Sequence, residues 1–129
     1  MKIVTAGIVR HQNRILIAQR RRGKAQEFLW EFPGGKLEPG ETLEECLKRE
    51  LFEEMRLDVE VGDFFMDSQF DYESGSILLK VFWANCMNED ISYLDSHEQV
   101  KWVEPHELSS YDFAPADRPV IRALLEQIA

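Results

Sequence analysis

The sequence predicts an α+β domain in which helices pack against a central mixed β-sheet. Two segments, residues 3–10 and 77–86, are apolar on both faces, as strands covered on each side are. Residues 42–55 and 118–128 carry apolar side chains at helical spacing. With 129 residues, of which 44 % are hydrophobic, the chain can build a core without disulfides, and we expect a single domain over residues 1–129.

The remaining elements follow from local patterns. Residues 14–19 return as a strand after the turn at residues 11–13, and residues 31–35 begin extended and end in a Pro-Gly-Gly turn. Thr42 can cap the helix that runs to about Met55. Further expected elements are strands over 58–63, 64–72 and 99–103, a helical turn starting at Glu104-Pro105, and an irregular segment over 111–117.

Charge and composition narrow the function. The net charge of −9 argues against DNA or RNA as a main partner, because neutralising a phosphate backbone requires Lys and Arg. A small phosphorylated ligand is compatible if metal ions supply positive charge. Cys46 and Cys86 lie in apolar patterns, which predicts buried reduced thiols. We find no signal peptide and no apolar run of about 20 residues, so we expect a cytoplasmic protein without a membrane partner, either monomer or homodimer.

Two stretches that precede the helix over residues 42–55 suit phosphate binding, namely a basic cluster and a glycine turn. The only basic cluster contains Arg20, Arg21, Arg22 and Lys24. Taken alone it is as well explained by a solvated loop, but its position just ahead of an acidic helix favours a phosphate-facing role.

The glycine turn that follows can bring backbone close to a ligand, because glycine has no side chain. Gly34 and Gly35 can offer a carbonyl to a metal and amides to a phosphate. Lys36 is a further candidate for a phosphate contact, although a lysine after a turn is commonly just exposed.

The helix over residues 42–55 carries acidic side chains where a structural helix would have apolar ones. On a wheel of ~100° per residue, Glu54 falls inside the apolar stripe and Glu50 at its edge. A carboxylate there is unfavourable unless it is paired or bound to a cation. Glu50, Glu53 and Glu54 are spaced i, i+3 and i+4, so their carboxylates converge. The pattern predicts a site for Mg²⁺, with Mn²⁺ as a substitute.

The alternative is a solvated acidic face with ion pairs within the helix. Arg49 can pair with Glu53, or fold back to Glu45. The position of Glu54 within the apolar stripe and the adjoining glycine turn favour the metal site over this alternative.

The stretch resembles the Nudix box, G-x5-E-x7-R-E-U-x-E-E-x-G-U. The matching residues are Gly35, Glu41, Arg49, Glu50, Leu51, Glu53, Glu54 and Leu57. Arg56 replaces the final glycine of the box, which we expect to perturb the helix exit more than the chemistry. The segments EFPGGK, ILIAQR and FAPADRPVI are similar to the MutT-type branch of Nudix hydrolases, and the last one looks closest to CTP pyrophosphohydrolase-like members.

This resemblance implies an α/β/α sandwich and Mg²⁺-dependent cleavage of a nucleoside triphosphate into a monophosphate and pyrophosphate by attack of water on phosphorus. The implied metal ligands are the Gly34 carbonyl, Glu50, Glu53 and Glu54. The candidate catalytic residues are Glu53, Glu50, Arg49 and Glu98. Glu98 resembles a distal carboxylate that serves some members as a further ligand or base, which leaves the general base open between Glu98 and a box glutamate. Arg20 resembles a substrate-contacting arginine.

Asp117 is the candidate for reading the base, because it stands where the resemblance to MutT implies an asparagine. An ionised aspartate only accepts hydrogen bonds, which suits the exocyclic amino group of cytosine. A buried aspartate can be protonated and then donate, so 8-oxo-dGTP stays open. Asp117 also suits the N-cap of the last helix.

Aromatic side chains are candidates for stacking on the base, and each is also a candidate for the core. They are Tyr72, Phe70, Trp30 and Phe113. His97 and His106 show no zinc spacing and are expected to be exposed.

The sequence therefore predicts a Mg²⁺-dependent nucleoside triphosphate pyrophosphohydrolase that prefers CTP, dCTP or 5-methyl-dCTP. The alternatives are an 8-oxo-(d)GTP diphosphatase that cleanses the nucleotide pool, and a non-catalytic Nudix-like binding module. The last is disfavoured because such modules typically lose box glutamates, and all four are present here.

Overall fold

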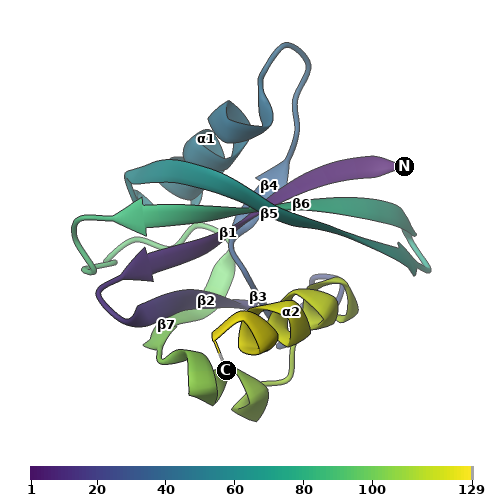
Figure 1. The fold of residues 1–129 in the computed structure, drawn as a ribbon. Coiled ribbons are helices and arrows are strands. Elements are labelled where there is room, and N and C mark those ends of the chain that lie inside the picture. Colours follow the sequence, from purple (N-terminus) through teal and green to yellow (C-terminus); the bar gives the residue numbers. More distant parts are fainter. Residues whose placement is uncertain (129) are drawn as a thin grey trace.

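The computed structural model describes residues 1–128, which form one mixed sheet with a helix on each face (Figure 1). Ala129, the last residue of the predicted domain, lies outside the described residues. The strands are β1 (Lys2–His11), β2 (Arg14–Arg20), β3 (Trp30–Glu31), β4 (Gly34–Lys36), β5 (Val59–Tyr72), β6 (Gly75–Cys86) and β7 (His97–Val103). The helices are α1 (Leu43–Met55), α2 (Arg118–Ile128) and the short 3-10 turns η1 (Pro105–Ser110) and η2 (Pro115–Asp117).

The two strands predicted to be apolar on both faces lie side by side in the middle of the sheet. The order is β3-β2-β1-β6-β5, with β4 also paired to β1 and β7 to β2. β1 and β6 run parallel, and the other pairs are antiparallel. The predicted mixed sheet is confirmed.

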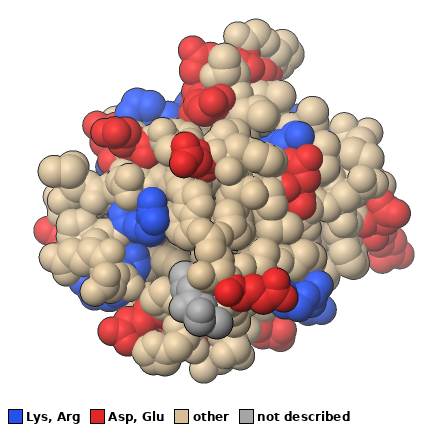
Figure 2. All heavy atoms as spheres, in the orientation of Figure 1, with Lys and Arg blue, Asp and Glu red and all other residues tan. Residues whose placement is uncertain are grey.

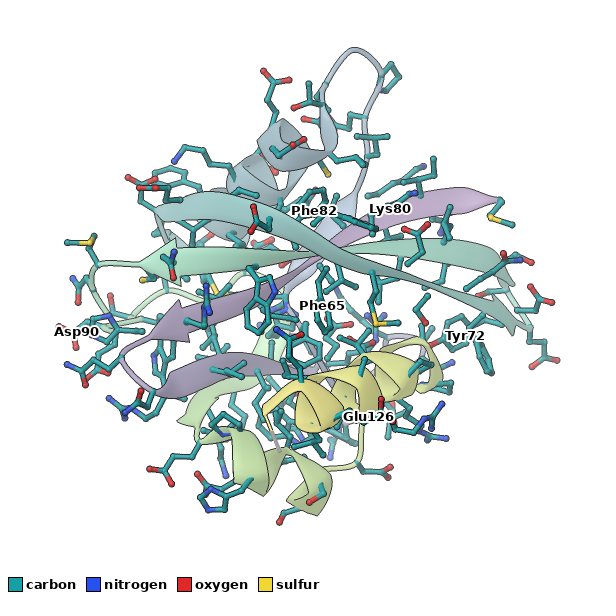
Figure 3. The ribbon with its side chains drawn as sticks, viewed as in Figure 1. Phe65, Tyr72, Lys80, Phe82, Asp90 and Glu126 are labelled. Atoms are coloured by element: carbon teal, nitrogen blue, oxygen red, sulfur yellow. The ribbon has the colours of Figure 1, made fainter. Side chains whose placement is uncertain are left out.

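A hydrophobic core lies on each face of the sheet. On one face, Leu47, Leu51 and Met55 of α1 pack on the strands. The opposite face is covered by α2 through Val120, Ile121 and Leu124. In Figure 3, Phe82 of β6 points towards α1 and Phe65 of β5 towards α2. The predicted α/β/α arrangement is therefore correct.

The strand boundaries differ from the prediction in three places. The expected strands over 58–63 and 64–72 are one strand, β5, because β6 pairs along its whole length. The pairing register shifts on both sides of Phe64, where the two strands were expected to be separate. The segment 31–35 is divided between β3 and β4, which pair with different strands. β7 begins at His97, two residues earlier than expected, because His97 pairs with Arg20.

Charges of both signs are interspersed on one face of the molecule (Figure 2). Among the described residues of the face seen in Figure 2, Lys and Arg are scattered among Asp and Glu rather than gathered into a basic patch. Within residues 1–128, every helix is too short or too polar to span a membrane.

The exit of α1 shows how the chain accommodates an arginine in place of glycine. Arg56 adopts a left-handed conformation with φ of 53°. Its Nη1 donates to the carbonyl oxygens of Phe52 and Glu53, both at 3.0 Å, and its guanidinium lies 4.4 Å from the ring centroid of Tyr93. These contacts offset the backbone strain of a left-handed residue, about 1–2 kcal/mol.

We expect Arg56→Ala to lower the free energy of unfolding by about 1–2 kcal/mol, because the strain stays while the hydrogen bonds and the cation–π contact are lost. Arg56→Gly loses the same contacts but relieves the strain, so its stability should stay within about 1 kcal/mol of the wild type. Urea unfolding of both variants measures the difference. An alanine variant as stable as the glycine variant would contradict this account.

Candidate active site

A cavity of about 510 Å³ lies where the glycine turn, α1, β7 and η2 come together. Its charged lining consists of the cations Lys2, Arg20, Lys24 and Lys36 and the acids Glu31, Glu50, Glu54 and Asp117. Its apolar wall includes Val4, Phe32, Ile77, Leu79 and Ala114, with Tyr72 beside them. Eight predicted site residues meet here: Arg20, Gly34, Gly35, Lys36, Glu50, Glu54, Tyr72 and Asp117. The predicted Arg49, Glu53 and Glu98 are not part of this lining.

The glycine turn lies against both β1 and α1. A side chain at Gly34 would collide with the backbone of Thr5 in the neighbouring strand. A side chain at Gly35 would collide with the carboxyl group of Glu50. The two glycines are therefore required for this close approach, which brings backbone polar groups beside an acidic side chain.

Arg49 organises the acidic side chains around it. It holds Glu41 through two hydrogen bonds, of 2.7 Å from Nη2 and 3.0 Å from Nε. Its Nη1 donates to Glu50 at 2.8 Å and to Glu53 at 3.1 Å. The hydrogen bonds from Arg49 lower the pKa of Glu41 to about 2. Arg49 thus orients two of the predicted metal ligands.

The alternative pairing of Arg49 with Glu45 is not what α1 uses. Glu45 instead forms a capping box with Thr42, with hydrogen bonds of 2.8 and 3.1 Å between each backbone N–H and the other side chain. The predicted cap at Thr42 is confirmed. Glu45 is therefore bonded to Thr42 at the start of the helix and not to Arg49.

Glu54 is the carboxylate with the least compensation. Its side chain is 16 % exposed, and its buried Oε2 has no hydrogen-bond partner among the described residues. Burial, followed by the charges of Glu50 and Glu31, raises the pKa of Glu54 to about 8. Burial also raises the pKa of Glu50. Such a group is stabilised by either a proton or a cation.

The donor set fits a divalent cation, although it is not yet assembled. Carboxylate oxygens beside a close backbone turn are the ligands that hard cations prefer. Within residues 1–128, no three His, Cys, Asp or Glu side chains already converge as a ligand set. Glu50 and Glu53 each accept a hydrogen bond from Nη1 of Arg49, and the side chain of Glu53 is 59 % exposed.

His97 was expected to be exposed, and this prediction is wrong. Its side chain is 4 % exposed and lines the cavity. Nε2 lies 2.9 Å from Oε2 of Glu31, whose other oxygen accepts a hydrogen bond of 2.9 Å from Arg20. Nδ1 lies 3.9 Å from Oε2 of Glu54. His106 is exposed as expected.

Sequence reasoning missed Glu31 as well as His97. The available signal was a charged residue between the two buried aromatics Trp30 and Phe32, directly before the glycine turn. Burial raises the pKa of Glu31, but the hydrogen bond from His97 and the charge of Arg20 outweigh it, and the pKa lies below its usual value.

Glu98 follows His97 in β7 and lies on the solvent side of that strand. It is exposed, and its Oε1 accepts a hydrogen bond of 3.3 Å from the backbone of Arg22. Its neighbour His97 takes the inward position. A catalytic role for Glu98 stays a prediction.

Asp117 is buried and also lines the cavity. It is 5 % exposed, and its Oδ1 accepts a hydrogen bond of 2.9 Å from the backbone N–H of Phe32. This bond joins η2 to the strand region, so among the described residues the expected capping of α2 is not observed. Burial, and then the charge of Glu31, raise the pKa of Asp117 well above its usual value.

Of the four candidate stacking residues, Tyr72 is the one that lines the cavity. Figure 3 shows it at the end of β5 beside α2, and its hydroxyl accepts a hydrogen bond of 3.0 Å from the backbone of Ala116. Phe70 packs against it with ring centroids 4.7 Å apart. Trp30 and Phe113 are buried in the core.

Comparison with known proteins agrees with this geometry. The family model described as NUDIX domain matches residues 1–124. CTP pyrophosphohydrolase of Escherichia coli is 35 % identical over 122 residues, covering 95 % of this chain and 90 % of the relative. The 8-oxo-dGTP diphosphatase of Haemophilus influenzae is 36 % identical over 127 residues, covering 96 % and 91 %.

Solved structures share the fold along the whole chain. The solution structure of the E. coli ORF135 protein is 34 % identical, with a TM-score of 0.81 and coverage of 100 % of this chain and 91 % of that one. The crystal structure of a MutT protein from Methanosarcina mazei has a TM-score of 0.89 at 22 % identity, covering 98 % and 94 %. The match of nearly the whole chain, together with the acidic helix and its glycine turn, shows that this chain belongs to the Nudix family of nucleotide pyrophosphohydrolases.

Proposed function

We propose that the chain is a Mg²⁺-dependent nucleoside triphosphate pyrophosphohydrolase that prefers cytosine nucleotides, namely CTP, dCTP and 5-methyl-dCTP. The observation that carries the proposal is a single cavity that joins the uncompensated carboxylate of Glu54 to the buried carboxyl group of Asp117. The first suits a metal-bound polyphosphate, and the second suits a polar base edge.

The polyphosphate end of the cavity would hold Mg²⁺ through Glu50, Glu53, Glu54 and the carbonyl of Gly34. When bound, the cation neutralises phosphate charge and acidifies the attacking water. Arg49 orients Glu50 and Glu53 for this role. A box glutamate would accept the proton of the attacking water. Glu98 is the alternative, and it would have to turn inward from its exposed position on β7.

The chain's own cations complete the neutralisation of the substrate. Lys24, Lys36 and Arg20 line the cavity and would contact phosphate oxygens, together with the backbone amide of Gly35. A protein of net charge −9 can bind a polyanion in this way, because the cations that line its cavity and the bound metal ion would face the substrate.

The base end supports cytosine through the protonation state of Asp117. Because the N–H of Phe32 donates to Oδ1, a proton on this carboxyl group resides on Oδ2. The raised pKa of Asp117 favours that neutral form. A neutral carboxyl group donates and accepts, and so matches the N3 acceptor and N4 donor of cytosine. This assignment revises the expectation from the sequence, in which an ionised Asp117 accepts from the amino group of cytosine. An ionised carboxylate also matches the two adjacent donors of guanine, whereas the neutral form matches cytosine at two atoms.

The second candidate is an 8-oxo-(d)GTP diphosphatase. It is supported by relatives that bear this name, including the Haemophilus influenzae protein.

A cytoplasmic location is supported by two buried free thiols, Cys46 and Cys86.

Pyrophosphate release from a nucleotide panel, with Mg²⁺ and with chelator, tests both activity and preference. We expect chelator to abolish release and kcat/KM for CTP or 5-methyl-dCTP to exceed that for 8-oxo-dGTP. If kcat/KM for 8-oxo-dGTP exceeded that for every cytosine nucleotide, the proposed preference for cytosine would be wrong.

Variants of Asp117 test how the base is read. Asp117→Asn retains one donor and one acceptor, so kcat/KM for CTP should stay within about tenfold of wild type. Asp117→Ala removes both and should lose about 100-fold, as expected for a bidentate base contact. A larger loss for the asparagine variant than for the alanine variant would show that Asp117 acts as an ionised acceptor.

A further inference from the structure

Two buried polar atoms of the cavity face each other without partners. Among the described residues, Oε2 of Glu54 and Nδ1 of His97 are the buried side-chain oxygen or nitrogen atoms that lack a hydrogen bond. They lie 3.9 Å apart, and both side chains line the cavity. Buried polar groups are normally satisfied, so a pair of unsatisfied atoms at this separation indicates a missing shared partner.

The orientation of the imidazole ring is fixed from its other side. Nε2 of His97 lies 2.9 Å from Oε2 of Glu31, an acceptor that is also held by Arg20. An ionised carboxylate only accepts, so Nε2 must donate to it. The neutral ring then carries its lone pair on Nδ1, directed at Glu54. This is the arrangement in which a second carboxylate orients a metal-binding histidine.

The charges around Glu54 favour a cation as the shared partner rather than a water molecule. Glu31, Glu50 and Glu54 all line this one cavity, so their carboxylates repel one another when all three are ionised. A bridging water would satisfy the hydrogen bonds but leave this repulsion in place. Two adjacent ligands of an octahedral ion, each bonded at about 2.1 Å, lie about 3.0 Å apart, so the two atoms, now 3.9 Å apart, would approach by about 1 Å on binding it.

We propose that Oε2 of Glu54 and Nδ1 of His97 bind the same divalent cation, so that this metal site contains an imidazole nitrogen among its oxygen ligands. The inference rests on the cation site proposed above and adds a ligand to it. Glu31 is then a positioning residue that holds the ring in the required tautomer through Nε2.

A nitrogen ligand changes which ions the site prefers. Imidazole suits first-row transition ions, whereas Mg²⁺ prefers oxygen alone. The site should therefore bind Mn²⁺ and Co²⁺ more tightly, relative to Mg²⁺, than a site without His97.

The test is electron spin echo spectroscopy of Mn²⁺ bound to the full, nucleotide-free chain. We expect the nitrogen modulation of a directly bound imidazole in the wild type, and a changed modulation when the protein is grown with ¹⁵N-labelled histidine. This comparison needs no substitution, so it stands even if variants at position 97 fold poorly. Bound Mn²⁺ without histidine modulation would overturn the proposal, and so would failure of Mn²⁺ to bind at all.

Titration of variants supplies the second measurement. His97→Asn should raise the Mn²⁺ dissociation constant at least tenfold and that of Mg²⁺ by less than about threefold. The matched control is His106→Asn, since His106 is 76 % exposed and should leave both constants unchanged. Equal losses for Mn²⁺ and Mg²⁺ in His97→Asn would count against a nitrogen ligand.

Glu54→Gln separates this inference from the proposed function. If Mn²⁺ binding is unaffected by Glu54→Gln, the cation site itself is wrong. If binding is lost in Glu54→Gln but histidine modulation is absent in the wild type, the cation site stands and only the role of His97 fails.

Discussion

Glu54→Gln should abolish pyrophosphate release while making the metal-free protein more stable at alkaline pH. The loss of activity follows from removing a carboxylate proposed to bind the metal, and we expect at least a 100-fold fall in kcat/KM. The gain in stability follows because glutamine has nearly the same shape as glutamate and leaves no uncompensated charge buried beside Glu50 and Glu31.

The pH dependence gives this prediction a clear sign. The pKa of Glu54 is about 8 in the folded protein and near 4.5 when the chain is unfolded. Between these values the folded state binds more protons, so wild-type stability falls as pH rises from about 4.5 to about 8. The glutamine variant lacks this fall, and its advantage should reach about 2–4 kcal/mol above pH 8.

Urea unfolding in chelator at pH 5 and pH 8.5 measures this effect. The matched control is Glu44→Gln, an exposed glutamate at the start of the same helix, which should change the free energy of unfolding little at either pH. A Glu54→Gln variant less stable than wild type at pH 8.5 would show that Glu54 is compensated in the metal-free protein.

Alanine at the two glycines of the turn should separate folding from chemistry. In Gly34→Ala the new side chain meets the backbone of Thr5, inside the pairing of β4 with β1, where neither strand can yield. We expect the free energy of unfolding to fall by at least about 3 kcal/mol. In Gly35→Ala the new side chain meets the carboxyl group of Glu50, which can rotate away.

Gly35→Ala should therefore fold but lose about 100-fold in kcat/KM, because Glu50 leaves its position beside Arg49. Gly62→Ala is the control, since its new side chain would meet only ordinary contacts at 3.4 Å or more. Urea unfolding and pyrophosphate release are measured for all three variants. Equal stability of the alanine variants at positions 34 and 35 would contradict the distinction.

The acidic helix could be predicted from the sequence because its determinants are local. Thr42 and Glu45 form the cap within one turn, and the apolar stripe that exposes Glu54 as anomalous spans a few turns. The expected effect of Arg56 on the helix exit stays a prediction, since Arg56 adopts the left-handed conformation that glycine favours at this position.

The inward-facing histidine could not be predicted in the same way. His97 reaches the cavity because β7 pairs with β2 in the register that sets His97 opposite Arg20. A shift of one residue would turn Glu98 inward instead, and no local pattern distinguishes the two registers. The bond between Asp117 and Phe32 joins residues 85 positions apart, and its effect on the protonation of Asp117 depends on that contact.

The parallel pairing of β1 with β6 has a consequence for the kinetics of folding. Its partners, such as Lys2 with Ile77 and Arg10 with Asn85, are separated by about 75 positions, so closing this loop carries a large entropic barrier. Val4 and Ile77 line the cavity from these two strands, and Asp117 follows much later in the chain. During synthesis, the binding cavity therefore cannot form until Asp117 has left the ribosome, and recovery of activity on refolding should coincide with the slowest step of sheet formation.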